Sequence, residues 1–451
     1  MRVVVVGAGL AGLRTARRLL DAGVDVELLE AGPRPGGRVR TVRTMVDGSA
    51  FAAGQYSESG AEWVDSVHHR LLGLMDRYGV GRLGTGEQWT VIRRWLYWKG
   101  ELLSPERIRE VEPTIGEQLE RFEAVVAAVA AGIVDPSRPG LHPEAATHDA
   151  RSLADAADDA GLGDLARLFK RRDSQGEFAE EPESMSLLFA AQQRAHQAVE
   201  AAATGDPDGV VAHRCDGGFT RVVDGLAGEV SGVLTLGESL LALSQDADRV
   251  VVTTNRRTLT ADYVVLATSL VPLRTVSWGD GLPSDLRDAI GGLGYGAITK
   301  TSVQWPRRSW PAGYATTESR AQRVYEPTVD QASAVDGPGI LMSYCGGQGG
   351  REWALLDEST RVAQAAGLMA AMHGLVDEPI GGWSRAWSAQ PRFGGSYAVY
   401  RPGEVTRYWD VLRRPWGRVH LAGEHVATCT GYMEGALESA DTVAARLCAA
   451  G

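Results

Sequence analysis

Residues 3–12 read VVVVGAGLAG, and this stretch decides the fold class. The four valines form a wholly apolar, β-branched run, which is typical of a buried parallel strand. Gly7 permits a tight turn after the strand, and Gly9 lets the backbone approach a pyrophosphate. Gly12 lets the following helix pack closely against the strand. The stretch therefore predicts a strand, a glycine-rich turn and a helix.

The next residues complete this unit. Leucine and alanine recur at helical spacing over residues 13–20, and alternating apolar residues over 24–30 predict a second strand that ends at Glu30. In such a βαβ unit a phosphate lies on the helix N-terminus, where free N–H groups favour an anion, and Glu30 accepts hydrogen bonds from a ribose. The unit predicts dinucleotide binding but does not distinguish NAD from FAD.

Further elements follow from periodicity and composition. Helices are expected over residues 115–131 and 186–203, and the small apolar run 124–134 is expected to be a buried helix. Three prolines between residues 136 and 143 predict a loop. Strands are expected over residues 233–243, 249–254, 263–267, 298–305, 339–344 and 419–422, and two further helices over residues 360–374 and 435–449.

Composition excludes several classes of protein. A formal net charge of −11 over 451 residues argues against a nucleic-acid or anionic-membrane partner. Four scattered cysteines show no CxxC spacing, so no metal site is expected and a reduced, cytoplasmic setting is the simplest interpretation. No signal peptide is recognised at Met1, and the run 124–134 is too short to span a bilayer.

The residues after the second strand read EAGPRPGGR over 30–38 and resemble an extension typical of the flavin-containing amine oxidases. The resemblance implies FAD, with Ala31 and Gly37 close to the cofactor and Arg38 helping to hold it. Gly32 departs from the family pattern, which often has arginine there, so a contact near the adenosine is in doubt.

Two C-terminal segments, LAGE (421–424) and GYMEGA (431–436), closely resemble the family's ending. They would form a second phosphate platform at a helix N-terminus, with Glu424 accepting hydrogen bonds from ribityl or pyrophosphate-linked hydroxyls. Leu240 matches a position that contacts the adenine through its backbone. The resemblance implies these further cofactor contacts: Gly60, Ala61, Gly423, Glu424, Gly431, Tyr432 and Met433.

Three features bear on catalysis. Lys300 resembles the family lysine that holds a water near flavin N5, although a strand lysine is more simply solvated. Tyr397 and Tyr432 match two aromatic residues that face each other in front of the flavin and offer apolar, π-rich faces to an amine. Singly, either tyrosine could be a core residue. Ser396 occupies the place where some relatives have a flavin-linked cysteine, so FAD is expected to be non-covalent.

The segment at Glu62 and Trp63 departs from the amino-acid-oxidase pattern. Those relatives carry an arginine there that clamps the substrate carboxylate, and a clamp cannot be built from Glu62 and Trp63. Glu62 could bind an ammonium group or act as a base, or it is a surface glutamate at a turn. Arg323 could restore anion binding or pair with Glu62.

These observations predict an α/β protein. Residues 1–66, 211–275 and 393–451 are expected to form a Rossmann-type FAD-binding domain. Residues 67–210 and 276–392 are expected to form a discontinuous α+β substrate domain, with a mixed sheet flanked by helices. The sequence leaves open whether two copies of the chain form a homodimer.

The expected reaction is FAD-dependent dehydrogenation of a C–N bond in an amine or amide, with reoxidation by O₂, in specialised metabolism. The imine is hydrolysed or trapped by an internal nucleophile. Two alternatives stay open: an L-amino-acid oxidase with another arginine as the clamp, and a flavin-binding scaffold without turnover. A carotenoid-type desaturase is disfavoured by the Tyr432 motif.

Overall fold

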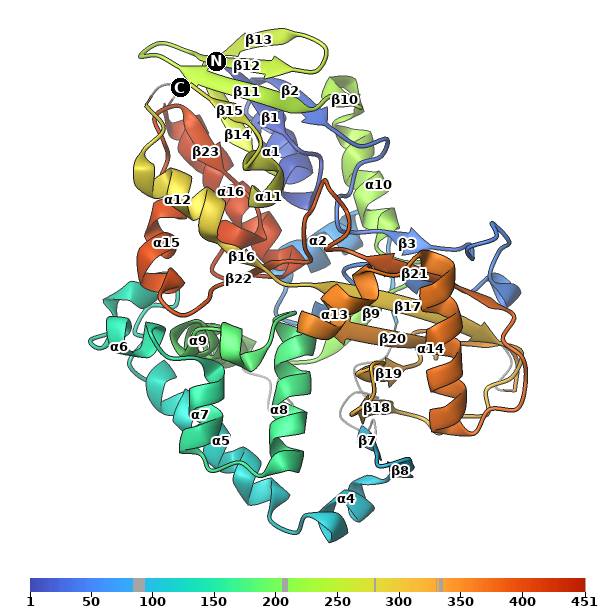
Figure 1. Ribbon diagram of the computed structural model, residues 1–451. Coiled ribbons are helices and arrows are strands. Elements are labelled where there is room, and N and C mark those ends of the chain that lie inside the picture. Colours follow the sequence, from blue (N-terminus) through green and yellow to red (C-terminus); the bar gives the residue numbers. More distant parts are fainter. Residues whose placement is uncertain (84–93, 205–209, 280, 330, 332–335, 451) are drawn as a thin grey trace.

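The computed structural model describes residues 1–83, 94–204, 210–279, 281–329, 331 and 336–450. A five-stranded parallel sheet lies at one end of the molecule, and a larger mixed sheet lies at the other (Figure 1). The fold is α/β with a Rossmann-type sheet, as the sequence predicts. In order across the parallel sheet, the strands are β10 (Leu234–Leu236), β2 (Asp25–Glu30), β1 (Arg2–Val6), β14 (Tyr263–Leu266) and β23 (Val419–Leu421).

The predicted βαβ unit is confirmed. Strand β1 is buried on both faces. Val3 and Val5 share a core with helix α1 (Leu10–Asp21), which packs against α16 (Met433–Ala450), whereas Val4 and Val6 share a core on the other face with residues 250–261. Strand β2 ends at Glu30, as expected. The carboxyl ends of β1 and β2 therefore meet the start of α1 at one edge of the sheet, where ligands of such sheets bind.

The prediction of one strand over residues 233–243 is wrong. Gly237 adopts a φ of +70°, and its N–H donates to the carbonyl of Gly32, so the chain turns out of the parallel sheet. A second sheet begins after this turn, and it is antiparallel except for its last strand pair, which is parallel. Its strands, in order, are β13 (Thr258–Ala261), β12 (Val250–Thr254), β11 (Leu240–Gln245) and β15 (Ser277–Trp278).

The mixed sheet has seven strands, of which only the β18–β7 pair is parallel. Helices α13 (Gly347–Ala354) and α14 (Glu358–His373) pack against it, and every residue of its strand β17 is buried. The strands, in order, are β21 (Gly381–Ala386), β17 (Ile298–Trp305), β20 (Gly339–Gly346), β19 (Arg323–Tyr325), β18 (Tyr314–Thr317), β7 (Arg94–Trp98) and β8 (Glu101–Leu103).

Helices fill residues 105–204. The helix expected over residues 115–131 is confirmed as α5, but the expectation of a buried helix over 124–134 holds only in part. The helix ends at Ala130 and buries one face, since Ala124 and Ala128 are exposed while Val126 and Val129 are buried. The helices here are α4 (Pro105–Val111), α5 (Ile115–Ala130), α6 (Ala145–Asp149), α7 (Leu153–Asp159), α8 (Asp164–Glu177) and α9 (Leu187–Thr204).

The remaining elements connect the two main sheets. They include the helices α2 (His69–Arg77), α10 (Thr220–Glu229), α11 (Leu270–Leu273), α12 (Ser284–Gly292) and α15 (Glu404–Arg413). Small sheets pair β3 (Thr41–Val42) with β4 (Ser57–Glu58), β16 (Gly294–Tyr295) with β22 (Ala398–Val399), and β9 (Ala212–Cys215) with β5 (Val64–Asp65) and β6 (Arg82–Leu83). Among the described helices, none has both the length and the apolar character that a membrane span requires.

Candidate active site

The glycine-rich turn after β1 is tightly packed at two positions and open at the third. A Cβ on Gly12 would lie 1.7 Å from the carbonyl oxygen of Gly7, and Gly7 itself has a φ of +101°. By contrast, a Cβ on Gly9 would meet no atom within 4 Å. Gly9 is the N-cap of α1 and supplies no capping side chain, so the first N–H groups of the helix are available to an anion. This geometry fits a pyrophosphate.

Glu30 is held in place at the end of β2. Its carboxylate accepts hydrogen bonds from the backbone N–H groups of Ala8, at 2.8 Å, and Gly32, at 2.6 Å. An arginine from a distant segment lies beside Gly32, because the Arg392 guanidinium is 3.8 Å from where a Gly32 Cβ would be and Arg392 lines the same cavity. Arg392 was not predicted from the sequence, since 360 residues separate it from Gly32.

One cavity of about 720 Å³ extends from Glu30 to Tyr397. Gly12 and Arg323 do not line it; Gly12 packs instead against the turn, as its predicted role in helix packing requires. The predicted site residues that do line it are Gly7, Gly9, Glu30, Ala31, Gly37, Arg38, Gly60, Ala61, Glu62, Leu240, Lys300, Tyr397, Gly423, Glu424, Gly431, Tyr432 and Met433.

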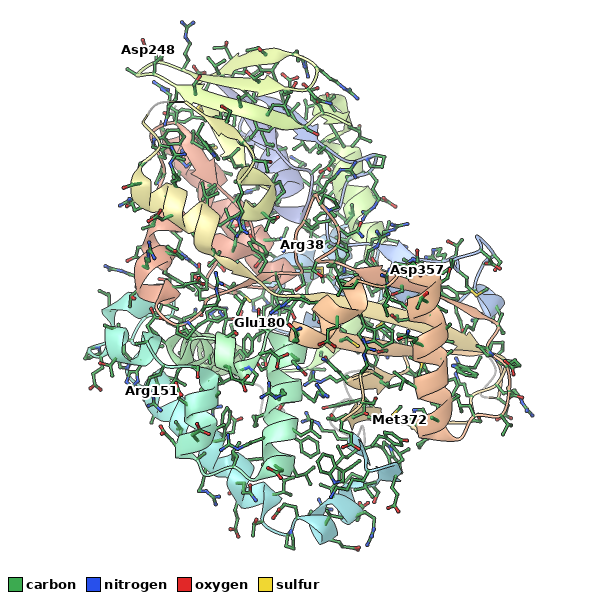
Figure 2. All side chains as sticks on the ribbon, in the orientation of Figure 1. Arg38, Arg151, Glu180, Asp248, Asp357 and Met372 are labelled. Atoms are coloured by element: carbon green, nitrogen blue, oxygen red, sulfur yellow. The ribbon has the colours of Figure 1, made fainter. Side chains whose placement is uncertain are left out.

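Arg38 and Glu424 tie together both ends of the chain. Figure 2 shows Arg38 near the centre of the molecule, where it forms a 2.8 Å ion pair with Glu424 and donates to the carbonyl of Ser396. Glu424 also accepts hydrogen bonds from the N–H groups of Ala398 and Gly431. Its oxygens therefore already hold protein groups, whereas the sequence analysis expected them to face cofactor hydroxyls.

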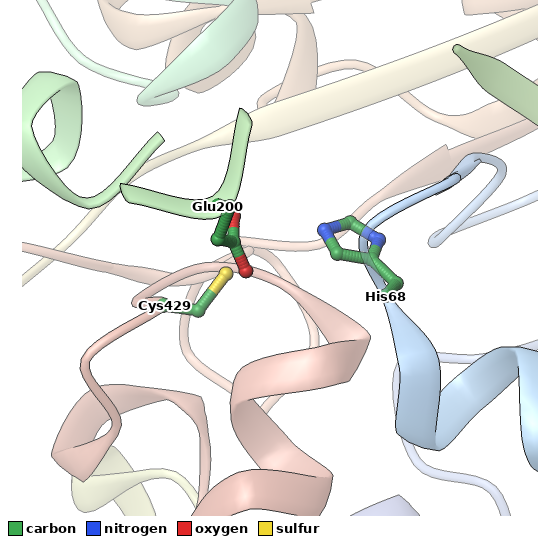
Figure 3. Close-up of side chains that lie close together, drawn as sticks. All are labelled: His68, Glu200 and Cys429. Atoms are coloured by element: carbon green, nitrogen blue, oxygen red, sulfur yellow. The ribbon is translucent and has the colours of Figure 1, made fainter. Parts of the chain in front are cut away.

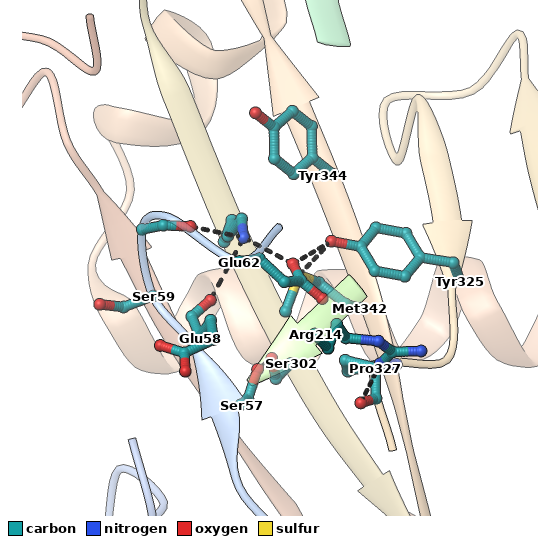
Figure 4. Close-up of polar contacts among 12 residues, drawn as sticks. Ser57, Glu58, Ser59, Glu62, Arg214, Ser302, Tyr325, Pro327, Met342 and Tyr344 are labelled. Carbon is teal, nitrogen blue, oxygen red and sulfur yellow. Dashed lines mark hydrogen bonds and ion pairs between the residues drawn. The ribbon is translucent and has the colours of Figure 1, made fainter. Parts of the chain in front are cut away.

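Lys300 and Glu62 form a buried ion pair beside the cavity. The Lys300 Nζ lies 2.8 Å from Glu62 Oε2, and it also donates to the carbonyls of Gly60 at 2.8 Å and Glu58 at 3.3 Å (Figure 4). Both side chains are at most 3% exposed. The alternatives of a solvated lysine and a surface glutamate are therefore wrong. All three ammonium protons have protein acceptors. To hold a water, Lys300 would have to give up its hydrogen bond to one of these three acceptors.

Tyr325 completes this network and was not predicted as a site residue. Its hydroxyl donates to Glu62 Oε2 at 2.6 Å, whereas Glu62 Oε1 is buried without a hydrogen bond (Figure 4). Burial of the neighbouring Glu58 raises the pKa of its carboxyl to about 7. The arrangement assigns Glu62 as the counter-ion of Lys300. Glu62 is among the residues that line the cavity, but its Oε1 atom is buried.

Two arginines near this network do not pair with Glu62. Arg323 forms a 2.7 Å ion pair with Asp173, and the Arg214 guanidinium stacks on the Trp63 ring at 4.9 Å. Trp63 itself lines the cavity. The structure therefore does not place Arg323 as a clamp in the cavity or as the partner of Glu62.

Tyr397 and Tyr432 line the cavity at the end away from Glu30. The Tyr397 hydroxyl donates to the carbonyl of Gly176 at 3.1 Å and lies 3.4 Å from the hydroxyl of Tyr344, whose ring faces Lys300. Tyr432 packs edge-on against His68. Burial raises the pKa of both Tyr397 and Tyr432, so both stay neutral and can offer their rings to an amine.

Three potential metal ligands lie close together, and one of them packs against Tyr432: His68, Glu200 and Cys429 (Figure 3). His68 Nδ1 accepts the N–H of Asp65 at 3.0 Å, so Nε2 carries the proton of the neutral ring. Burial lowers the pKa of His68 to about 4 and raises that of the Cys429 thiol well above its usual value. A protonated ring nitrogen and a neutral thiol are poor metal ligands.

Comparisons with known proteins show the family to which the chain belongs. The model of the flavin containing amine oxidoreductase family matches residues 10–448. A Mycobacterium tuberculosis protein named as the flavin-containing monoamine oxidase AofH is 26% identical over 99% of this chain and 96% of its own. The flavin-dependent L-tryptophan oxidase RebO of Lentzea aerocolonigenes is 26% identical over 97% and 96%, respectively.

The fold is also found in a solved structure. Cyclohexylamine oxidase from Brevibacterium oxydans IH-35A superposes with a TM-score of 0.84 at 22% identity, covering 100% of this chain and 99% of that one. The resemblance seen in the sequence is thus confirmed. With the family model spanning residues 10–448, the chain belongs to the flavin-containing amine oxidoreductases, and it is an FAD-dependent enzyme of the amine oxidase type.

Proposed function

We propose that this enzyme oxidises an amine to an imine by removing a hydride from the carbon next to nitrogen. One observation carries the proposal: Lys300, Tyr397 and Tyr432 line the same cavity as the dinucleotide-binding turn. Bound FAD would accept the hydride and would be reoxidised by O₂. The chain's own residues bind and orient the amine and exclude water.

The two tyrosines prepare the amine for reaction. Loss of a hydride requires the nitrogen lone pair, so the reacting amine must be neutral. The apolar faces of Tyr397 and Tyr432 disfavour a charged ammonium by desolvation. Lys300 is fixed by Glu62, so its charge is compensated and does not repel the amine. These side chains select the neutral amine at the reacting position.

An L-amino-acid oxidase is the second candidate, favoured by relatives such as RebO. A substrate carboxylate needs an available cation near the tyrosines. Arg323 is bound to Asp173, and Lys300 to Glu62. This pairing favours an amine or amide without a carboxylate. A scaffold without turnover is disfavoured, because the Lys300 and tyrosine constellation is complete.

The reaction is tested by anaerobic mixing of the FAD-loaded enzyme with a panel of amines, amides and amino acids. We expect at least one amine to bleach the flavin absorbance, with peroxide formed on admission of air. Free L-amino acids should react at least about 100-fold more slowly, because an uncompensated carboxylate costs several kcal/mol to bury. Faster reduction by amino acids than by amines would overturn the assignment.

We further propose that FAD is held without a covalent bond. Ser396 replaces the linking cysteine, and its hydroxyl donates to the carbonyl of Gly296 at 2.9 Å. Denaturation followed by filtration should release essentially all of the flavin, measured by absorbance of the filtrate. Flavin retained on the unfolded chain would contradict this prediction.

The domain division also stands as a proposal. Every strand of the parallel sheet comes from residues 1–66, 211–275 or 393–451, and every strand of the seven-stranded sheet from residues 67–210 or 276–392.

We propose a cytoplasmic enzyme of specialised metabolism, in keeping with its four unpaired cysteines. The imine is released to water or trapped by a nucleophile of the same substrate.

A further inference from the structure

The tyrosine end of the cavity carries more negative than positive charge. Asp65 and Glu177 line it together with Tyr397 and Tyr432, and neither carboxylate was recognised from the sequence. The lining cation at this end is Lys300, which Glu62 neutralises. Within the described lining, no cation therefore balances Asp65 and Glu177 directly.

Glu177 is the last residue of helix α8 (Asp164–Glu177), so it combines two negative features. The C-terminal end of a helix carries partial negative charge from its free carbonyls, and the carboxylate adds a full charge. The side chain accepts a hydrogen bond from the Gln197 amide at 3.3 Å. The negative end of α8 therefore lies next to Tyr397, whose hydroxyl donates a hydrogen bond to the carbonyl of Gly176, the residue before Glu177.

The charges around Glu177 come from two elements, α8 itself and β19. Asp173, one turn earlier on α8, raises the pKa of Glu177, while Arg323 of β19 and Lys170 of α8 lower it. Desolvation at the cavity wall is the largest cause of the raised pKa of Glu177, although the residue keeps an exposed surface. Both cations are already shared, since Arg323 pairs with Asp173 and Lys170 pairs with Asp173 and Glu123.

Asp65 is the last residue of β5 (Val64–Asp65) and lines the same cavity. Burial, followed by the charges of Glu200 and Glu177, raises the pKa of Asp65 to about 6. His68 is its nearest basic group, at 3.7 Å, but this ring is only 3% exposed and stays neutral. Asp65 is therefore a carboxylate for which the described protein supplies no positive charge.

We propose that the substrate is a diamine, with one nitrogen oxidised between Tyr397 and Tyr432 and the second, as an ammonium, bound by Asp65 and Glu177. This inference rests on the proposed amine oxidation. The second ammonium supplies the missing positive charge, while the reacting nitrogen stays neutral against the aromatic rings. A diamine has no carboxylate, which agrees with the pairing of Arg323 and Lys300 to protein acids.

The experiment compares linear α,ω-diamines of three to eight carbons with n-alkylamines of the same length. The readout is the rate of anaerobic flavin reduction per molar substrate. We expect the preferred diamine to exceed its matched monoamine by at least about 30-fold, because a desolvated charge pair contributes this much or more to binding. The preference should weaken below about pH 6, where Asp65 becomes protonated in the free enzyme.

Variants identify the residues responsible. Asp65→Asn and Glu177→Gln should each lower the diamine-to-monoamine ratio by about 10-fold or more, and Glu177→Lys should shift preference toward ω-amino acids. Glu120→Gln, an exposed acid on α5, is the matched control and should keep the ratio of the parent enzyme. FAD content and melting temperature show that each variant is folded.

The outcomes separate the two proposals. Equal rates for diamines and monoamines, or an unchanged ratio in both acid variants, would overturn the diamine assignment while leaving amine oxidation in place. Absence of flavin reduction by every amine would overturn the proposed function itself.

Discussion

Replacing Lys300 with methionine should lower the free energy of unfolding by about 3–5 kcal/mol, because it leaves the Glu62 carboxylate buried without its counter-ion. The ion pair is 2.8 Å long, and its side chains are 3% and 2% exposed. Glu62 would keep only the Tyr325 hydroxyl as a hydrogen-bond donor. Urea denaturation followed by tryptophan fluorescence measures the change.

The double variant Lys300→Met/Glu62→Gln should recover most of this loss. A glutamine carries no charge, and its carbonyl can still accept the Tyr325 hydroxyl, so the buried site is again electrically satisfied. Arg307→Met is the matched control, since Arg307 pairs with Asp377 at the surface and is 64% exposed. Its stability should match that of the parent, because exposed pairs contribute little. Equal instability of the single and double variants would show that the uncompensated Glu62 carboxylate is not the cause of the stability lost in Lys300→Met.

Variants of the Lys300–Glu62 pair also distinguish a role in catalysis from a role in stability. If Glu62 were the base, Glu62→Gln would slow flavin reduction by substrate at every pH. As the counter-ion of Lys300, Glu62 acts through the position of that ammonium, which also bonds the carbonyls of Gly60 and Glu58. The buried Oε1 favours the second role, since a base must reach the proton that it removes.

The sequence predicts the cofactor end of the molecule well because its determinants are local. The four valines, the three glycines and Glu30 lie within 30 residues, and each has a required geometric role. Strand β2 and helix α1 accordingly occur where expected. The prediction of a single strand over 233–243 is wrong because one glycine, Gly237, turns the chain from one sheet to another. The spacing of apolar residues does not indicate that turn.

The substrate end is less predictable because its partners are distant in sequence. Lys300 and Glu62 are 238 residues apart, and Tyr325 reaches Glu62 over 263 residues. Nothing local marks Asp65 or Glu177 as cavity residues, since acids at a strand end or in a last helical turn are ordinarily solvated. Arg323 was a reasonable candidate by residue type, but Asp173, which binds it, comes from another element.

A single methyl group at Gly9 should weaken FAD binding at least about 100-fold without destabilising the protein that lacks FAD. Gly9 has a φ of −72°, which alanine adopts easily, and its Cβ would meet no protein atom within 4 Å. That empty space lies at the start of α1, where a pyrophosphate needs to approach the backbone, so the methyl group would displace the ligand alone. Fluorescence titration of the FAD-free protein measures the affinity.

Gly12→Ala should instead destabilise the folded chain by more than about 3 kcal/mol, even without FAD. Its Cβ would lie 1.7 Å from the Gly7 carbonyl oxygen, and only a shift of the backbone turn could relieve that contact. Gly228→Ala is the control: this glycine lies in α10 with no neighbour within 4 Å of a Cβ, and the change should alter neither FAD affinity nor folding adversely. Because Gly9 and Gly12 belong to one turn, opposite effects on binding and folding would show that the turn separates ligand contact from helix packing. Normal FAD affinity in Gly9→Ala would mean that the pyrophosphate binds elsewhere in the cavity.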